Sequence, residues 1–378
     1  MTRLRIIAIA LVSILILQWT GLVNFGLNIG TQSFWVKPEP PHLTEPQERY
    51  AIGLFYDEET YPGFLDGARQ AVAEVNARGG IADSPLELIE VDETDLSWRE
   101  ADRNLAARRK VHKDHTIAAI GHRDRSALNL ARAFFNDAGI VHINALVFDT
   151  GVGKPSFRHS ISTLPTLEML GAGIVSGLAD QEMRTLAILG DRSRAGLELR
   201  VAIADAAAAR DIEVVFDRTR ASAQGGYLTE LTALSDLGAE GLVLLLEGEE
   251  LQAAVDQMAL IGMTQAVVLG HPTRFAVLDP VTNTPNLRLY VPGFESRMDQ
   301  AFSGAKTLWA EQGFDAVHMI AAAADELRTT DPALIASGLR TILTFEGETG
   351  AHVFDAHGRI TSKPITIRRI AAQPQVTD

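Results

Sequence analysis

The sequence has no cysteine among its 378 residues. This excludes disulfides, thiolate metal ligands, a cysteine nucleophile and a lipid anchor attached to cysteine. Basic residues are also scarce, because 34 Lys and Arg stand against 48 Asp and Glu, for a net charge of −14. Nucleic-acid binding needs a basic surface, so we exclude a nucleic-acid partner. We find no internal sequence repeat.

Motifs for catalysis are missing as well. The chain has no G-x-S-x-G, no H-E-x-x-H and no G-x-G-x-x-G after a strand. The segment GVGKPS (Gly151–Ser156) resembles a phosphate loop, but Phe148 occupies the first glycine position and Pro155 follows the lysine. His112 and His115 could share a helix face, yet no third metal ligand accompanies them. We therefore predict that the protein is not an enzyme and has neither a metal site nor a cofactor.

The overall composition is that of a folded protein. Hydrophobic residues make up 46% and charged residues 22% of the chain, which is typical of a globular protein. A chain of 378 residues is long enough for two domains.

The N-terminal segment indicates export. Arg3 and Arg5 precede an apolar run, residues 6–17, and no further charged residue occurs before Lys37. A cleaved signal peptide and an uncleaved membrane helix both fit this pattern. Residues 18–30 offer no good small-residue cleavage site, so we expect residues 1–36 to be a retained transmembrane anchor with its basic end in the cytoplasm. Residues 37–49, rich in Pro and Glu, are expected to form a tether, although an ordinary disordered leader fits equally well.

The remainder of the chain alternates between short apolar strands and amphipathic helices. After the strand 50–56, the residues Phe64, Ala68, Ala71 and Val75 follow the spacing of a helix with one apolar face. Asn76–Gly80 then ends this helix, and a strand follows at 86–91. We predict further strands at 117–120, 140–144, 185–189, 212–216, 241–246 and 266–269, and further helices at 98–111, 126–137, 167–179, 195–210, 227–237 and 250–261. This alternation predicts parallel α/β sheets, with a ligand crevice at the carboxyl ends of the strands.

Three phrases resemble the type I periplasmic binding proteins, the branched-chain amino acid and amide receptor family of ABC importers. They are AEVNARGGI (73–81), GFDAVHMI (313–320) and FEGETGAHVFDAHGRI (345–360). The resemblance covers most of residues 50–370. It implies two Rossmann-like, doubly wound lobes joined by a three-strand hinge, with crossovers near 157–160, 270–274 and 343–346. We assign residues 50–158 plus 275–343 to lobe 1 and residues 159–274 plus 344–378 to lobe 2, and residues 286–312 are shorter than the family's usual segment.

The resemblance places the ligand site on the loops at the strand ends. The loop GHRDRS (121–126) carries Asp124 and Arg125 where the family has small hydroxyl residues, and NALVF (144–148) is apolar where hydroxyls are usual. The loop GDRSRAG (190–196) lacks the family's tyrosine, and GHPT (270–273) lacks an acidic residue. A buried zwitterion needs partners for both of its charges, so we predict a ligand other than a plain α-amino acid. The predicted ligand-binding residues are Tyr56, Tyr61, His122, Arg123, Asp124, Arg125, Asn144, Leu146, Asp191, Arg194, Glu247 and His271.

Two kinds of ligand fit these loops. Four arginines, Arg123, Arg125, Arg192 and Arg194, could clamp an anion, or the NALVF loop could line an apolar pocket. The arginines could equally be ordinary surface residues.

The predicted function is capture of a small molecule between two lobes and its delivery to an ABC permease. The alternative is a membrane-anchored sensor ectodomain, or an accessory subunit of a membrane complex, that uses the same fold without transport. Both hypotheses place the protein in the periplasm, anchored to the inner membrane.

Overall fold

The structure is a computed structural model that describes residues 47–94, 107–112, 115–148, 157–220, 226–275, 287–294 and 305–370, with side chains of the last range from residue 308. The predicted anchor and nearly all of the tether lie outside these residues, as does most of the predicted helix 98–111. No helix in the described ranges is long and apolar enough to span a membrane.

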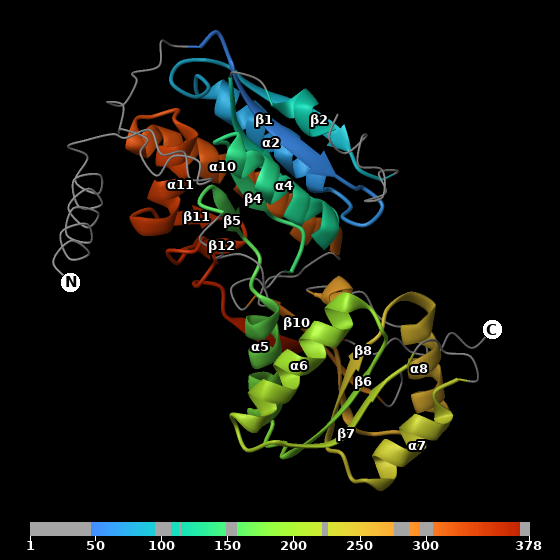
Figure 1. The fold of residues 1–378 in the computed structure, drawn as a ribbon. Coiled ribbons are helices and arrows are strands. Elements are labelled where there is room, and N and C mark those ends of the chain that lie inside the picture. Colours follow the sequence, from blue (N-terminus) through green and yellow to red (C-terminus); the bar gives the residue numbers. More distant parts are fainter. Residues whose placement is uncertain are drawn as a thin grey trace, which may run out of the picture. The chain divides into compact units, whose positions relative to one another are not determined.

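The first sheet is fully parallel and has five strands in the order β2-β1-β3-β4-β5. Its strands are β1 (Tyr50–Tyr56), β2 (Leu86–Asp92), β3 (Thr116–Ile120), β4 (Val141–Asn144) and β5 (Ser160–Ser162). The helices α2 (Phe64–Ala77), α4 (Arg125–Asp137), α10 (Ala305–Leu327) and α11 (Pro332–Thr341) accompany it (Figure 1). We call this sheet and these helices the first half.

The second sheet has six strands in the order β13-β10-β9-β8-β6-β7. Its strands are β6 (Thr185–Gly190), β7 (Glu213–Thr219), β8 (Gly241–Leu245), β9 (Ala266–Leu269), β10 (Arg288–Phe294) and β13 (Ile365–Arg369). All pairs are parallel except β10 with β13. With α5 (Leu167–Ala179), α6 (Arg194–Ala208), α7 (Leu228–Asp236) and α8 (Gly248–Leu260) it forms what we call the second half (Figure 1).

The predicted α/β fold with parallel sheets is confirmed. The strands at 50–56 and 266–269 and the helix at 167–179 match their predicted bounds, and the other predicted elements within the described residues differ by a few residues at their ends. Beyond residue 330, Asp331 caps α11 as its sequence indicates, because its carboxylate accepts from the backbone N–H groups of Ala333 and Leu334. The phrase at 345–360 contains the short hairpin of β11 (Phe345–Gly347) and β12 (Gly350–His352).

Two strands do not lie in the sheet to which the predicted lobe boundaries assign them. β5 begins after residue 158 but pairs with β4 of the first sheet. β10 follows residue 275 but pairs with β9 of the second sheet. In both places the chain completes a ladder with the preceding strand before it changes sheets. The division into lobes otherwise stays a prediction.

Side chains on each strand alternate between two apolar layers. In β1, Ile52 and Leu54 pack with the α2 side of the first sheet, whereas Phe55 packs with Phe135 of α4 on the opposite face. A third cluster covers one face of the second sheet beneath α7 and α8. The interior strands β3, β8 and β9 are thus buried on both faces, which is why they read as continuous apolar runs, whereas the edge strands β2 and β7 carry exposed charged residues.

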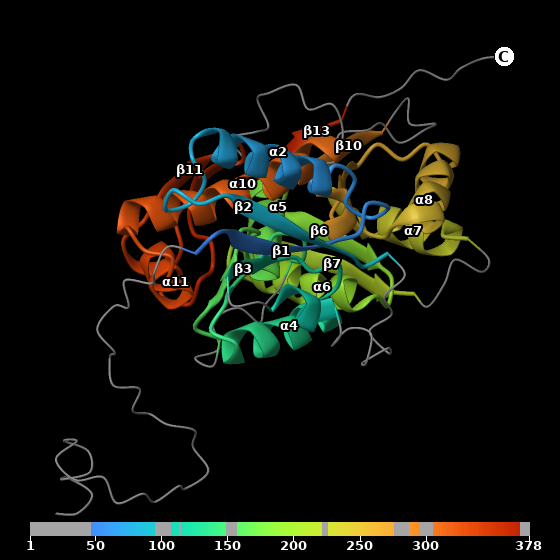
Figure 2. The same cartoon turned by 90° about the horizontal axis from the view of Figure 1, so that it is seen from above.

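Glycines allow α2 and α10 to pack unusually closely. A Cβ atom on Gly67 would lie 1.8 Å from the carbonyl oxygen of Ala310, and one on Gly313 would lie 2.3 Å from the carbonyl oxygen of Phe64. Figures 1 and 2 both show the two helices side by side, although they are far apart in the sequence.

Candidate ligand-binding site

A cavity of about 300 Å³ lies among loops from both halves. The first half contributes the loop after β1, the start of α4, the loop after β4 and part of α10, and the second half contributes the start of α6 and the turn after β9. Its lining residues are Thr60, Tyr61, Arg123, Asp124, Arg125, Leu146, Val147, Phe148, Arg194, Ala195, His271, Pro272, Thr273 and Trp309. The loops follow the carboxyl ends of parallel strands, the usual place of a ligand site in an α/β sheet.

The N-terminus of α4 is occupied by the chain's own carboxylate. Asp124 Oδ1 accepts from the backbone N–H of Ser126 at 2.7 Å and from that of Ala127 at 2.9 Å. Since Asp124 already satisfies these amides, they are not available to a second anion.

The arginines around the cavity have protein partners. Arg123 Nη1 donates to the carbonyl oxygens of Glu93 at 2.9 Å and Thr94 at 2.6 Å, and to Asp57 Oδ2 at 3.3 Å. Arg125 and Arg194, from different halves, both donate to the carboxylate of Glu198. Burial raises the pKa of Glu198, but its hydrogen bonds with these arginines outweigh burial and hold the pKa below the usual range. The carboxylate is therefore ionised and offsets one of the two positive charges.

One wall of the cavity is apolar. Leu146, Val147 and Phe148 form it, and Trp309 meets Tyr61 edge to face with ring centroids 4.9 Å apart. The buried Asn144 lies behind this wall and shapes it, because its side chain exchanges hydrogen bonds with the backbone of Val147 at 2.7 and 3.0 Å. Asn144 thus positions the wall and does not line the cavity.

Tyr61 is held in place as a neutral phenol. Its hydroxyl donates to the carbonyl oxygen of Arg123 at 2.9 Å. Burial, with Asp57 and Asp124 nearby, raises its pKa strongly. The ring therefore adds apolar surface to the cavity without a negative charge.

Two predicted site residues lie away from the cavity. His122 is fully buried and its Nδ1 is 2.6 Å from Glu93 Oε1. Tyr56 is half-buried at the end of β1 and lines a separate surface depression with Glu90 and Asp92.

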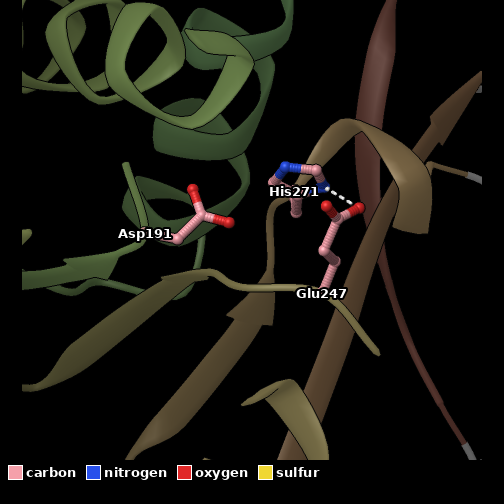
Figure 3. A group of neighbouring side chains, drawn as sticks. All are labelled: Asp191, Glu247 and His271. Carbon is pink, nitrogen blue, oxygen red and sulfur yellow. Dashed lines mark ion pairs between the residues drawn. The ribbon is translucent and has the colours of Figure 1, made fainter. Parts of the chain in front are cut away.

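Asp191, Glu247 and His271 gather at the ends of three neighbouring strands. They follow β6, β8 and β9, and Figure 3 shows their side chains converging. One ligand atom from each lies within 4.8 Å of the others, and Glu247 Oε2 is 3.6 Å from His271 Nδ1. The loop 270–273 itself carries no acidic residue, but the loop after β8 brings Glu247 next to His271.

Seven predicted residues line the cavity: Tyr61, Arg123, Asp124, Arg125, Leu146, Arg194 and His271. Their ligand contacts stay a prediction. Val147 and Phe148 belong to the NALVF loop of the apolar-pocket hypothesis, whereas Thr60, Ala195, Pro272 and Thr273 were not among the predicted ligand-binding residues. Trp309 had no local signal, since it reaches the cavity from α10, which follows far along the chain.

A family model described as "Periplasmic binding protein" matches residues 56–374. A search of curated proteins found no match.

Solved structures of similar fold include three described as transporter binding proteins. The Desulfitobacterium hafniense ABC transporter substrate-binding protein, in complex with Leu, has 20% identity, covers 85% of this chain and 98% of its own, and has a TM-score of 0.70. A branched chain amino acid ABC transporter periplasmic ligand-binding protein from Burkholderia xenovorans has 16% identity, coverages of 87% and 92%, and a TM-score of 0.71. LivJ from Streptococcus pneumoniae, in complex with isoleucine, has 17% identity, coverages of 85% and 99%, and a TM-score of 0.61. At these identities the likeness shows the fold.

Proposed function

Because the chain belongs to the periplasmic binding protein family, we propose that it captures a small solute in the cavity between its two halves and delivers it to an ABC importer. The observation that carries this proposal is the cavity of about 300 Å³, whose walls come from strand-end loops of both sheets. A solute that touches both halves stabilises the arrangement in which they are close, which is how binding can be signalled to a membrane partner.

The partner and location follow from the family and from the N-terminal segment. Similar folds belong to substrate-binding proteins of ABC transporters, so the proposed partner is an ABC permease. The apolar run at residues 6–17 supports export, and the absence of a small-residue cleavage site supports a retained inner-membrane anchor. Intact mass measurement of protein purified from membranes distinguishes a retained from a cleaved N-terminus.

We propose further that the solute is not a free α-amino acid but a molecule with a substantial apolar part. The amides at the start of α4 are capped by Asp124, and the arginines beside them are paired with protein oxygens. The wall of Leu146, Val147, Phe148 and Trp309 instead offers apolar contact. This favours the apolar-pocket hypothesis over the anion clamp.

Calorimetric titration with leucine, isoleucine, valine and glutamate tests the solute class. We expect no binding tighter than a dissociation constant of about 100 μM, because a buried α-carboxylate without donors costs several kcal/mol. Binding of any of the four at about 1 μM would contradict the proposed class while leaving solute capture intact.

A charge placed in the apolar wall tests the cavity itself. A solute library is screened by thermal shift on the unmodified chain, and each hit is titrated against Val147→Glu. We expect at least tenfold weaker binding, because an unpaired carboxylate in the wall must be desolvated by the solute. Val201→Glu is the matched control, since Val201 is 51% exposed on α6. Equal affinity of both variants would place the solute elsewhere.

Small-angle scattering separates transport from the alternative. A transport receptor should compact when a confirmed solute is added. Binding without compaction would favour the anchored sensor or accessory subunit.

A further inference from the structure

We propose that Asp191, Glu247 and His271 form a binding site for a divalent transition-metal ion such as Zn²⁺. Each residue offers one ligand atom, and these atoms lie within 4.8 Å of one another (Figure 3). The proposal goes beyond solute capture and does not depend on it.

Sheet register brings the three residues together. β6, β8 and β9 are adjacent parallel strands, with Gly190 paired to Leu245 and Leu244 paired to Leu269. Each proposed ligand residue lies within two positions of the end of its strand. In addition, the backbone N–H of Asp191 donates to the carbonyl oxygen of Leu245 at 3.1 Å, which fixes the first two loops to each other. Ligands at strand ends are held more rigidly than ligands in long loops.

The carboxylates lack the donors that two neighbouring anions require. Among the described residues, the carboxylates of Asp191 and Glu247 together accept one hydrogen bond. It comes from the backbone N–H of Ser193 to Asp191 Oδ1, at 2.9 Å. The Glu247 side chain does not cap α8, and within the described ranges its one ion-pair partner is His271. Because like charges in one site repel each other, a cation between them lowers the free energy of the pair.

His271 is the observation that distinguishes this group from an ordinary acidic cluster. Its side chain is only 4% exposed yet faces the Glu247 carboxylate. Thr273 Oγ1 lies 2.8 Å from its Nδ1 and Ser193 Oγ lies 3.4 Å from its Nε2. The backbone N–H of Thr273 also donates to Nδ1 at 3.4 Å, which favours the tautomer with its proton on Nε2. Nδ1, the nitrogen that faces Glu247, then offers its lone pair to the ion, and Ser193 Oγ accepts the proton of Nε2, as metal-bound histidines require.

The ligand set selects the kind of ion. One imidazole and two carboxylates suit Zn²⁺ and related transition metals, whereas Mg²⁺ and Ca²⁺ prefer oxygen ligands throughout. Tetrahedral ligands at about 2.0–2.2 Å from zinc stand about 3.4 Å apart, so the group must contract. Glu247 is 49% exposed and can rotate inward to do so. With three protein ligands a fourth position stays open, and because His271 also lines the cavity, the ion would border the solute space.

Titration with metal alone tests the site. The full chain, without a histidine tag, is stripped with EDTA and titrated with ZnCl₂ by calorimetry, and with CoCl₂ by visible absorption. We expect one site with a dissociation constant below about 10 μM, and cobalt bands typical of nitrogen and oxygen ligands. Glu247→Gln, Asp191→Asn and His271→Gln should each weaken zinc binding at least tenfold.

Glu249→Gln is the matched control, because Glu249 is an exposed acid two residues from Glu247 and lies outside the cluster. It should bind zinc as the unmodified chain does. The proposal is overturned if no zinc binds, if Glu247→Gln binds as tightly as Glu249→Gln, or if cobalt shows only the spectrum of the hydrated ion. Glu247→Gln keeps the test decisive even if His271→Gln fails to fold, since Glu247 is half-exposed. Solute binding measured in EDTA separates a failure here from a failure of solute capture.

Discussion

At the scale of single residues, the first half contains histidines enclosed in its interior. His142 is 1% exposed, and its ring lies parallel to that of Phe135 with centroids 5.7 Å apart and close to that of His122 at 5.6 Å. Burial lowers the pKa of His142 well below its usual range, and His122, Arg132 and Arg108 lower it further. The folded protein therefore keeps this imidazole neutral.

His142 should make the protein less stable in mild acid. Below a pH of about 6.5 the unfolded chain binds a proton at this residue that the folded chain does not, so stability falls as the pH decreases toward the lower pKa of the folded state. The slope reaches about 1.4 kcal/mol per pH unit for one such group. The replacement His142→Phe keeps a ring against Phe135 and should remove this contribution to the pH dependence of stability. The free energy of unfolding in urea, measured at pH 8, 6.5 and 5.5, checks this.

The exposed His357 provides the control, as His357→Phe. It should keep the pH slope of the unmodified chain. If the curves of His142→Phe and the unmodified chain run parallel between pH 6.5 and 5.5, His142 does not cause the acid sensitivity.

At the scale of elements, the close contact of α2 with α10 ties two distant parts of the sequence together. Gly67 and Gly313 each face backbone of the opposite helix at a distance that no Cβ atom tolerates. The apolar face of α2 therefore packs against α10 with almost no space between the two helix backbones.

Gly67→Ala should separate these helices and destabilise the protein by about 2–3 kcal/mol, because overpacking forces the backbone to move. The free energy of unfolding in urea measures the change. Gln70→Ala, at an exposed position of the same helix, should shift it by less than about 0.5 kcal/mol. A similar small effect for Gly67→Ala would mean that the helices can move apart at little cost.

Elements with strong periodicity could be predicted from the sequence, and those that depend on partners could not. The helix at 167–179 and the strand at 266–269 are fixed by local apolar spacing. By contrast, β10 contains Pro292 and was missed, since proline argues against a strand in an interior position. In the site, strand-end loops indicated Tyr61 and His271, but the wall position of Trp309 follows from how α10 packs, which no local pattern records.

At the scale of the whole described molecule, one ion pair joins the two halves beside the cavity. Arg125 at the start of α4 pairs with Glu198 of α6, and Arg194 supports the same carboxylate. The pair can form only while the two halves are close. It therefore favours that arrangement even without a solute.

Glu198→Gln should shift the chain toward more open arrangements. A partly exposed ion pair contributes about 0.5–1 kcal/mol, so the ratio of open to closed forms should rise about two- to fivefold. Small-angle scattering should show a larger radius of gyration for Glu198→Gln, and raised salt should produce a similar change in the unmodified chain.

Glu213→Gln, an exposed acid on β7, is the control and should leave the scattering unchanged. An unchanged radius for Glu198→Gln as well would show that the ion pair does not govern how the halves are spaced.

The order in which the chain visits its sheets also affects how it can be made. β10 belongs to the second sheet, α10 then returns to lie on α2, and β13 goes back to pair with β10. When a nascent chain has emerged only as far as α8, the face of α2 that packs against α10 is therefore exposed. The edge of the second sheet that pairs with β10 is unpaired at the same stage. Neither half can be expressed as an uninterrupted fragment, and shortening the gene before residue 365 should yield an aggregating product.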